Sequence, residues 1–154
     1  MVLMIRKMTK NELKTSLKLV KTVFMEFEAP DYSEEGIQTF LNFIELDAIQ
    51  KMLDEGILKC WVCIKDKKIV GVLASKNINH IFMLFVDKAY HKRGIAKQLF
   101  DEFSQDVKRN SAKRLLTVNS SPYAVGFYHK MGFKNTDNEL EKDGIRFVPM
   151  QMSI

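Results

Sequence analysis

The sequence lacks a long apolar run. None of its hydrophobic stretches approaches the ~20 residues that a membrane-spanning helix needs. It also lacks the pattern of a secretory signal peptide, because Arg6 and Lys7 follow the first apolar residues at once, with no apolar core or small-residue cleavage site. We therefore expect a protein without a membrane partner, located in the cytoplasm.

Cysteine is scarce. The chain has two, Cys60 and Cys63, and a structural zinc site would need a second pair of ligands. The pair lies in KCWVCIK, a segment typical of a β-strand, in which residues three apart point to opposite faces. We expect two separate buried thiols, no metal site, and a core position for Trp61 between them.

Repeats, low-complexity tracts and interdomain linkers are also missing. The chain of 154 residues is long enough for one well-packed domain and short for two. Hydrophobic residues make up 46% and charged residues 28%, which is typical of globular proteins. We therefore treat residues 1–154 as a single domain.

The net charge is +5, and the basic residues concentrate in one part of the chain. No long Lys/Arg tract and no recognition-helix signature accompanies them, so a small phosphorylated ligand is favoured over nucleic acid. A nucleic-acid-binding module would instead require a steep salt dependence of binding. One third of the 24 basic residues lie between positions 88 and 114: Lys88, Lys92, Arg93, Lys97, Lys108, Arg109, Lys113 and Arg114.

The first third of the chain predicts a strand and two helices. Residues 1–6 read as a short strand, and Thr9 with Glu12 forms a capping box before an amphipathic helix over 13–27. Ser33 is expected to cap a second helix that ends near Gly56. The residues predicted to face the core from this second helix are Ile37, Phe40, Leu41, Ile44 and Ala48.

The rest of the chain alternates strands and helices. KCWVCIK and IVGVLASK read as a hairpin joined by a polar turn over 66–68, followed by a third strand over 81–86. A helix follows Gly94, with Leu99, Phe100, Phe103 and Val107 on one face, then a strand over 113–119. A short helix is predicted from Ser121-Pro122 to Gly132. Two strands joined by a turn at 143–144 follow it. Pro149 suggests that the second of these strands has an edge or a bulge.

This order, β-α-α-β-β-β-α-β-α-β-β, predicts an α/β (α+β) domain. Three strands in a meander followed by crossovers imply a mixed, mostly antiparallel sheet with helices on both faces. The segment HIFMLFVDKAYHKRGIAK, residues 80–97, is its organising stretch, because a strand, a basic turn with Gly94 and a helix start can hold a phosphate with backbone N–H groups. Gly94 and Asn119 both fall at carboxyl ends of strands, where ligands bind in such sheets.

Two segments resemble the GNAT superfamily of N-acetyltransferases. VDKAYHKRGIAKQLF is similar to the family's acyl-CoA pyrophosphate loop and following helix, and Asn119 with SPYAVGFYHKMGF is similar to its second signature. His91 stands where the family usually has Gln or Arg. The resemblance implies the GNAT fold, acetyl-CoA (coenzyme A) as cofactor, and a cofactor site formed by Leu84, Phe85, Val86, His91, Lys92, Arg93, Gly94, Ile95, Ala96, Lys97 and Asn119.

The same resemblance assigns Tyr128 to catalysis, as a phenol that can donate a proton to the leaving thiolate. The base is left between two options. His80 begins the central strand and titrates in a suitable range. The alternative is the acidic linker EFEAPDYSEE, whose Glu26, Glu28 and Tyr32 are expected to bind the substrate.

These residues predict transfer of an acetyl group to a primary amine by direct attack in a ternary complex. A catalytically idle acyl-CoA sensor is the alternative. The acidic linker suggests a cationic acceptor, which could be a polyamine, an aminoglycoside, a lysine side chain or a peptide N-terminus. The strand-rich tail could supply a homodimer edge.

Overall fold

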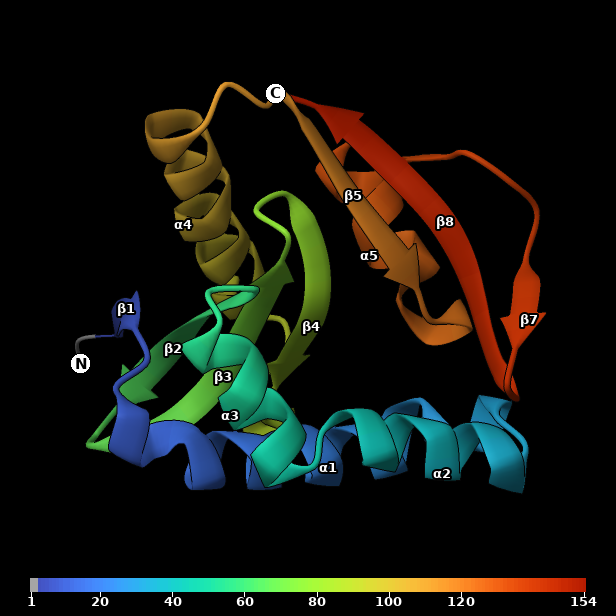
Figure 1. Ribbon diagram of the computed structural model, residues 1–154, viewed down its shortest axis with the longest axis horizontal. Coiled ribbons are helices and arrows are strands. Elements are labelled where there is room, and N and C mark those ends of the chain that lie inside the picture. The colour runs from blue at the N-terminus through green and yellow to red at the C-terminus, as the bar shows by residue number, and fades with distance from the viewer. Residues whose placement is uncertain (1–2) are drawn as a thin grey trace.

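The computed structural model describes residues 3–154 as one mixed sheet with helices on both faces (Figure 1). Its strands are β1 (Met4–Lys7), β2 (Leu58–Lys65), β3 (Lys68–Lys76), β4 (His80–Val86), β5 (Leu115–Ser120), β6 (Lys134–Asn135), β7 (Leu140–Lys142) and β8 (Ile145–Ser153). The helices are α1 (Leu13–Phe27), α2 (Glu34–Phe43), α3 (Leu46–Asp54), α4 (Ile95–Asn110) and α5 (Val125–Met131). The sheet order is β1-β2-β3-β4-β5-β8-β6, with β7 added to β8.

The sheet is antiparallel except between β4 and β5, where pairing is parallel. This parallel ladder covers only His80↔Thr117 and Ile81↔Val118. Beyond it the two strands separate, as Figure 1 shows, so β4 from Phe82 onward keeps a free edge on the β5 side. The predicted fold class is confirmed.

The two faces of the sheet carry two separate cores. One contains α1, α2 and α3 against the strands, and the other contains α4 and α5. Cys60 lies in the first core and Cys63 in the second, so the two thiols face opposite sides as predicted and both are free. Trp61 is buried beside Phe103 of α4.

Local signals placed most element boundaries correctly. The Thr9 N–H donates to Glu12 Oε1 at 2.8 Å before α1, and Ser33 Oγ accepts the Gly36 N–H at 3.2 Å at the start of α2. Asp66 and Lys67 both have positive φ, as a two-residue hairpin turn requires. The strand predicted over residues 1–6 corresponds to β1, Met4–Lys7. Residues 1 and 2 of the predicted strand lie outside the described part of the chain.

Two predictions about elements were wrong. The segment predicted as one second helix forms two helices, because the chain turns at Ile44 and Glu45. As a result, Ile49 of α3 packs into the core, and Ala48, predicted to be buried, is exposed. The tail contains three strands instead of two. Pro149 lies between the stretch of β8 that pairs with β7 and the stretch that pairs with β6, and its carbonyl accepts the Thr136 N–H at 2.9 Å.

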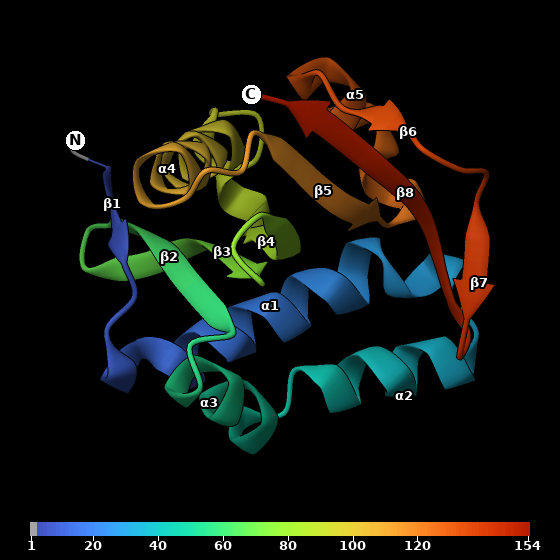
Figure 2. The ribbon, with the colours of Figure 1, turned by 45° about the horizontal axis from the view of Figure 1, so that its top comes forward.

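The hairpin of β7 and β8 docks on the first turn of α2 (Figures 1 and 2). Thr39 Oγ1 donates to the Asp143 carbonyl at 2.8 Å. A Cβ atom added to Gly36 would collide with the Gly144 carbonyl oxygen, so only glycine allows the two backbones to approach this closely. This contact ties the end of the chain to a helix near its beginning.

Candidate active site

Two cavities open where β4 and β5 separate. The loop pocket, of about 600 Å³, lies between the end of β4, the loop before α4, and α5. The aromatic pocket, of about 460 Å³, lies between β4, β5, α2 and the β7–β8 hairpin. Five residues line both pockets and so form their shared wall: Glu28, Leu84, Phe85, Ala124 and Tyr128.

The loop before α4 presents a row of free backbone donors. Gly94 has φ +77°, and Lys92 has φ +61°, so the chain reverses sharply before the helix. The first helical bond runs from the Gln98 N–H to the Gly94 carbonyl at 3.0 Å, and the N–H groups of 92–97 have no acceptor within the described residues. Such a cradle at a helix N-terminus fits the diphosphate of coenzyme A.

The side chains of this loop have other partners. His91 Nε2 donates to the Val86 carbonyl at 2.7 Å, which fixes the loop to the end of β4. Lys97 Nζ pairs with Asp101 at 3.0 Å, and the Arg93 guanidinium lies 5.4 Å from the centre of the Tyr90 ring. The His91 side chain therefore anchors the loop, and the free backbone N–H groups of 92–97 are its candidate anion donors.

The free edge of β4 has a second feature that exposes its main chain. Ala74 pairs with Met83 but Ser75 pairs with Ile81, so Phe82 is an extra residue on β4. This bulge disturbs the ladder beside the pocket wall. Backbone groups of this segment thus face the space between the two strands.

Tyr128 comes from α5 and is buried among aromatic rings. Its ring centre lies 5.2 Å from Phe127 and 5.4 Å from Phe133, and 5% of the residue is exposed. Burial, followed by the nearby negative charge of Glu28, raises the pKa of Tyr128 above its ordinary value. The phenol therefore stays protonated throughout the physiological range and can serve as a proton donor at the shared wall.

Glu28 ends α1 and is the carboxylate on the shared wall. Burial raises its pKa to about 7; the neighbouring Ser121 hydroxyl lowers it and the charge of Asp31 raises it further. A carboxyl with this pKa accepts a proton readily near neutral pH. Ser121 lines the aromatic pocket but not the loop pocket, and apart from this interaction with Glu28 its buried hydroxyl has no hydrogen-bond partner in residues 3–154.

The other candidates for binding or catalysis are spread more widely. Glu26 is exposed, pairs with Lys88 at 2.8 Å and lines neither pocket, so the structure does not bring it together with the other predicted site residues. Tyr32 lines the aromatic pocket. His80 also lines it, with Nδ1 2.8 Å from Thr117 Oγ1, and burial, then the charge of Lys76, lowers its pKa.

Asn119, expected at the cofactor, lies on the wall of the aromatic pocket and not of the loop pocket. The sequence reading also missed wall residues on both sides. Phe27, Tyr123 and Lys130 line the loop pocket, and Phe27 contacts both His91 and Tyr123 with ring centres 5.0 and 5.3 Å apart. The aromatic pocket adds Phe40, Phe43, Phe82 and Phe147, for which the available signal was the high phenylalanine content, 11 residues.

Comparison with known proteins identifies the family. The model of the acetyltransferase (GNAT) domain matches residues 28–154, and the chain belongs to this family. It is an acetyltransferase-type domain whose usual cofactor is acetyl-CoA. No helix in residues 3–154 is both long and apolar enough to cross a membrane.

Individual relatives are distant but similar over their whole length. A Bacillus subtilis (strain 168) protein that bears a provisional acetyltransferase name is 25% identical over 150 residues, which cover 95% of this chain and 93% of that protein. A GCN5-related N-acetyltransferase from Rhodopseudomonas palustris has a TM-score of 0.84 at 22% identity, covering 100% and 99%. PaiA N-acetyltransferase from Thermoplasma acidophilum, crystallised with coenzyme A, has a TM-score of 0.82 at 20% identity, covering 100% of both chains. These two structures share the fold.

Gly94→Asp should weaken coenzyme A binding about tenfold or more, because its carboxylate would accept the free N–H groups and repel the diphosphate. Asp tolerates the left-handed conformation better than most residues, which limits the cost in stability. Isothermal titration with coenzyme A measures the loss. Gly56→Asp is the matched control: Gly56 also has positive φ with open space around it, and lies outside both pockets. Equal affinities for the two variants would contradict the cradle.

Glu28→Gln should stabilise the fold more at pH 8 than at pH 5. The folded pKa of about 7 exceeds the ordinary 4.5, so the folded state holds the extra proton between these values, and wild-type stability falls as pH rises through that window. Glutamine does not ionise, so the variant avoids this decrease in the free energy of unfolding, which is about 1–3 kcal/mol. Urea unfolding of both proteins at the two pH values measures it. The exposed Glu102→Gln serves as control, and a stability difference between the wild type and Glu28→Gln that did not change with pH would refute the assignment.

Proposed function

We propose that this protein is an acetyl-CoA-dependent N-acetyltransferase that acetylates a primary amine by direct attack in a ternary complex. The main observation that supports this proposal is that two pockets meet at a wall formed in part by Glu28 and Tyr128. One pocket offers the anion cradle and the other has no such cradle. This supports binding of cofactor and acceptor at the same time, from opposite sides of the wall.

The loop pocket fits coenzyme A through the backbone of 92–97 and the free edge of β4. Acetyl-CoA supplies the acetyl group as a thioester, whose carbonyl carbon is the site of attack and whose sulfur is the leaving group. Main-chain N–H groups of Leu84–Val86 are the proposed donors to the carbonyl oxygen. A donor fixed there stabilises the negative charge that develops during attack more than it stabilises the ground state.

Glu28 is the proposed general base. An alkylammonium has a pKa near 10 and must lose a proton before its nitrogen can attack. Glu28 lines both pockets and has a pKa of about 7, whereas His80 lines only the aromatic pocket and has a lowered pKa. The proton passes from the ammonium to Glu28 and then to solvent.

Tyr128 is the proposed general acid. It donates the phenolic proton to the leaving sulfur and regains the second proton that the nitrogen loses as the amide forms. The balance is one N–C bond formed, one C–S bond broken, and one proton released to solvent. Both cysteines are buried in the two cores away from the pocket walls, which supports direct transfer without an acyl-enzyme.

We retain the cytoplasm as the expected compartment.

Tyr128→Phe should lower kcat by about 10²-fold or more, because the variant keeps the ring but loses the acid. Coenzyme A affinity should change little, since the phenol is the part removed. Steady-state release of free thiol with an amine acceptor measures kcat, and calorimetry measures the affinity. Unchanged kcat would exclude the acid role. Coenzyme A binding without turnover on any amine would instead support the idle acyl-CoA sensor.

The pH profile of kcat/KM distinguishes the two bases. Activity of the wild type should rise with pH through about 7, because Glu28 must be deprotonated to accept a proton. Glu28→Gln should lose this rise and retain only the ionisation of the amine itself. His80→Gln should keep the rise near 7. The opposite result, loss in the His80 variant alone, would assign the base to His80.

A further inference from the structure

The aromatic pocket is apolar along most of its length. Its rings come from four separate parts of the chain, so it is assembled by the fold and not by one element. Phe40 stacks on Phe24 with ring centres 3.9 Å apart, and Phe85 meets Phe40 edge-on at 6.0 Å, which holds these rings in place. The aromatic wall residues are Tyr32, Phe40, Phe43, Phe82, Phe85, Tyr128 and Phe147.

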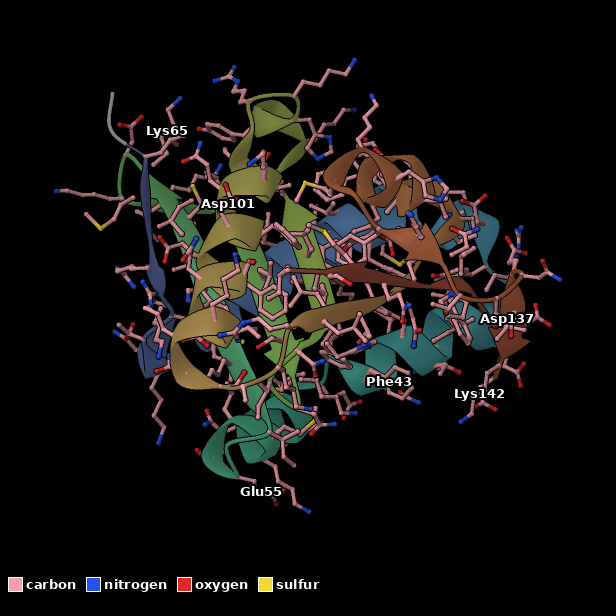
Figure 3. All side chains as sticks on the ribbon, turned by 90° about the horizontal axis from the view of Figure 1, so that it is seen from above. Phe43, Glu55, Lys65, Asp101, Asp137 and Lys142 are labelled. Atoms are coloured by element: carbon pink, nitrogen blue, oxygen red, sulfur yellow. The ribbon has the colours of Figure 1, made fainter. Side chains whose placement is uncertain are left out.

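Its charged groups sit at the two ends. Glu28 is at the inner end, on the wall shared with the loop pocket. Lys142 and Asp143 are consecutive residues of opposite charge on the hairpin; Figure 3 shows Lys142 to the right of Phe43, the last residue of α2. Glu26 faces Lys88 outside the pocket, and Asp31 is not a wall residue. Of the acidic residues of the linker, Glu28 lines this pocket, and Asp143 of the hairpin adds a second carboxylate to its wall.

The pocket is closed on its hairpin side by the contact between Gly36 and Gly144 and the bond from Thr39 to Asp143. Ile145 and Phe147, which alternate with Arg146 along β8, face the pocket, while the Arg146 guanidinium is held by Glu139 at 3.0 Å. The result is a bounded space of about 460 Å³, in the range of small-molecule sites. Its wall also carries polar groups, among them His80, Asn119 and Ser120, but its aromatic rings give a bound ligand mainly apolar surface to contact.

The buried Ser121 hydroxyl is a separate observation that points to a ligand. It lies close enough to the Glu28 carboxyl to lower the pKa of that group, makes no other hydrogen bond within residues 3–154, and is 8% exposed by residue. A buried hydroxyl with unused hydrogen-bonding capacity can bind a polar group of a ligand. An amino group placed between Ser121 and Glu28 would be such a group.

We propose that the acceptor is a small primary monoamine carrying an aromatic side group, an arylalkylamine. The amino group lies between Glu28 and Ser121, and the ring lies among Phe40, Phe85 and Phe147. This deepens the proposed N-acetyltransferase function and rests on it: the N–C bond to the acetyl group forms, the thioester C–S bond breaks, and one proton leaves through Glu28. Among amine classes, it favours aromatic monoamines over polyamines, aminoglycosides and peptides.

The test compares acceptors in a thiol-release assay with acetyl-CoA: phenethylamine, tryptamine, propylamine, spermidine, kanamycin and a lysine-containing peptide. We expect kcat/KM for the two aromatic amines to exceed that for propylamine and spermidine at least tenfold. Calorimetric titration of phenethylamine into the coenzyme A complex gives binding without turnover. Higher kcat/KM for spermidine, kanamycin or the peptide would overturn the assignment.

Phe147→Ala tests the ring site directly. It should lower kcat/KM for phenethylamine about tenfold, mainly through KM, and change propylamine less than threefold. Leu140→Ala is the matched control, because Leu140 pairs with Phe147 across the hairpin, is exposed and lines neither pocket. It should leave both acceptors unchanged.

Equal losses for phenethylamine and propylamine in Phe147→Ala would mean that the ring only supports the hairpin, and would refute the ring site. The two levels of inference fail differently. Acetylation of another amine class with poor activity on aromatic amines would reject the acceptor class alone. Coenzyme A binding with no thiol release from any of the six acceptors, and no phenethylamine binding, would reject the proposed function together with it.

Discussion

The site depends on the short parallel ladder between β4 and β5. Two residue pairs join these strands, and after Ile81 and Val118 they separate. Every other part of the site uses the space that this separation creates: the loop before α4 closes one side, and α2 with the β7–β8 hairpin closes the other. A longer ladder would fill the space with backbone hydrogen bonds and leave no edge of β4 for a ligand.

Burial at the shared wall raises the pKa of both Glu28 and Tyr128. Glu28 becomes a stronger base than a solvent-exposed carboxylate, and Tyr128 becomes a phenol that does not ionise near neutral pH. Each effect arises mainly because the charged form is poorly solvated there. The negative charge of Glu28 adds to the effect on Tyr128, so the two groups are electrostatically coupled.

Features set by local sequence were predicted well. The helix after Gly94, the cap at Ser33 and the opposite directions of Cys60 and Cys63 follow from periodicity and turn chemistry within a few residues. The position of Tyr128 was predicted by resemblance to a family signature, and the structure places it on the wall between the pockets.

Features that depend on contacts between residues far apart in the sequence were not predicted. The pattern of apolar residues over 34–54 is compatible with one helix, and the turn at Ile44 is determined by how α3 packs on α1 and β2. The environment of Glu28 depends on Ser121, more than ninety positions away in the sequence. The acidic residues of the linker alone therefore could not predict the raised pKa of Glu28 or the different surroundings of Glu28 and Glu26. The aromatic pocket is likewise a product of tertiary structure.

The mutual fit of Gly36 and Gly144 has a consequence for the order in which the molecule is completed. These backbones touch across 108 positions of sequence, so the outer wall of the aromatic pocket cannot exist until Gly144 has been synthesised. The anion cradle at Gly94 is synthesised some fifty residues earlier. A nascent chain therefore gains its cofactor loop before it can enclose an acceptor, and neither glycine can acquire a side chain unless the opposing backbone moves away.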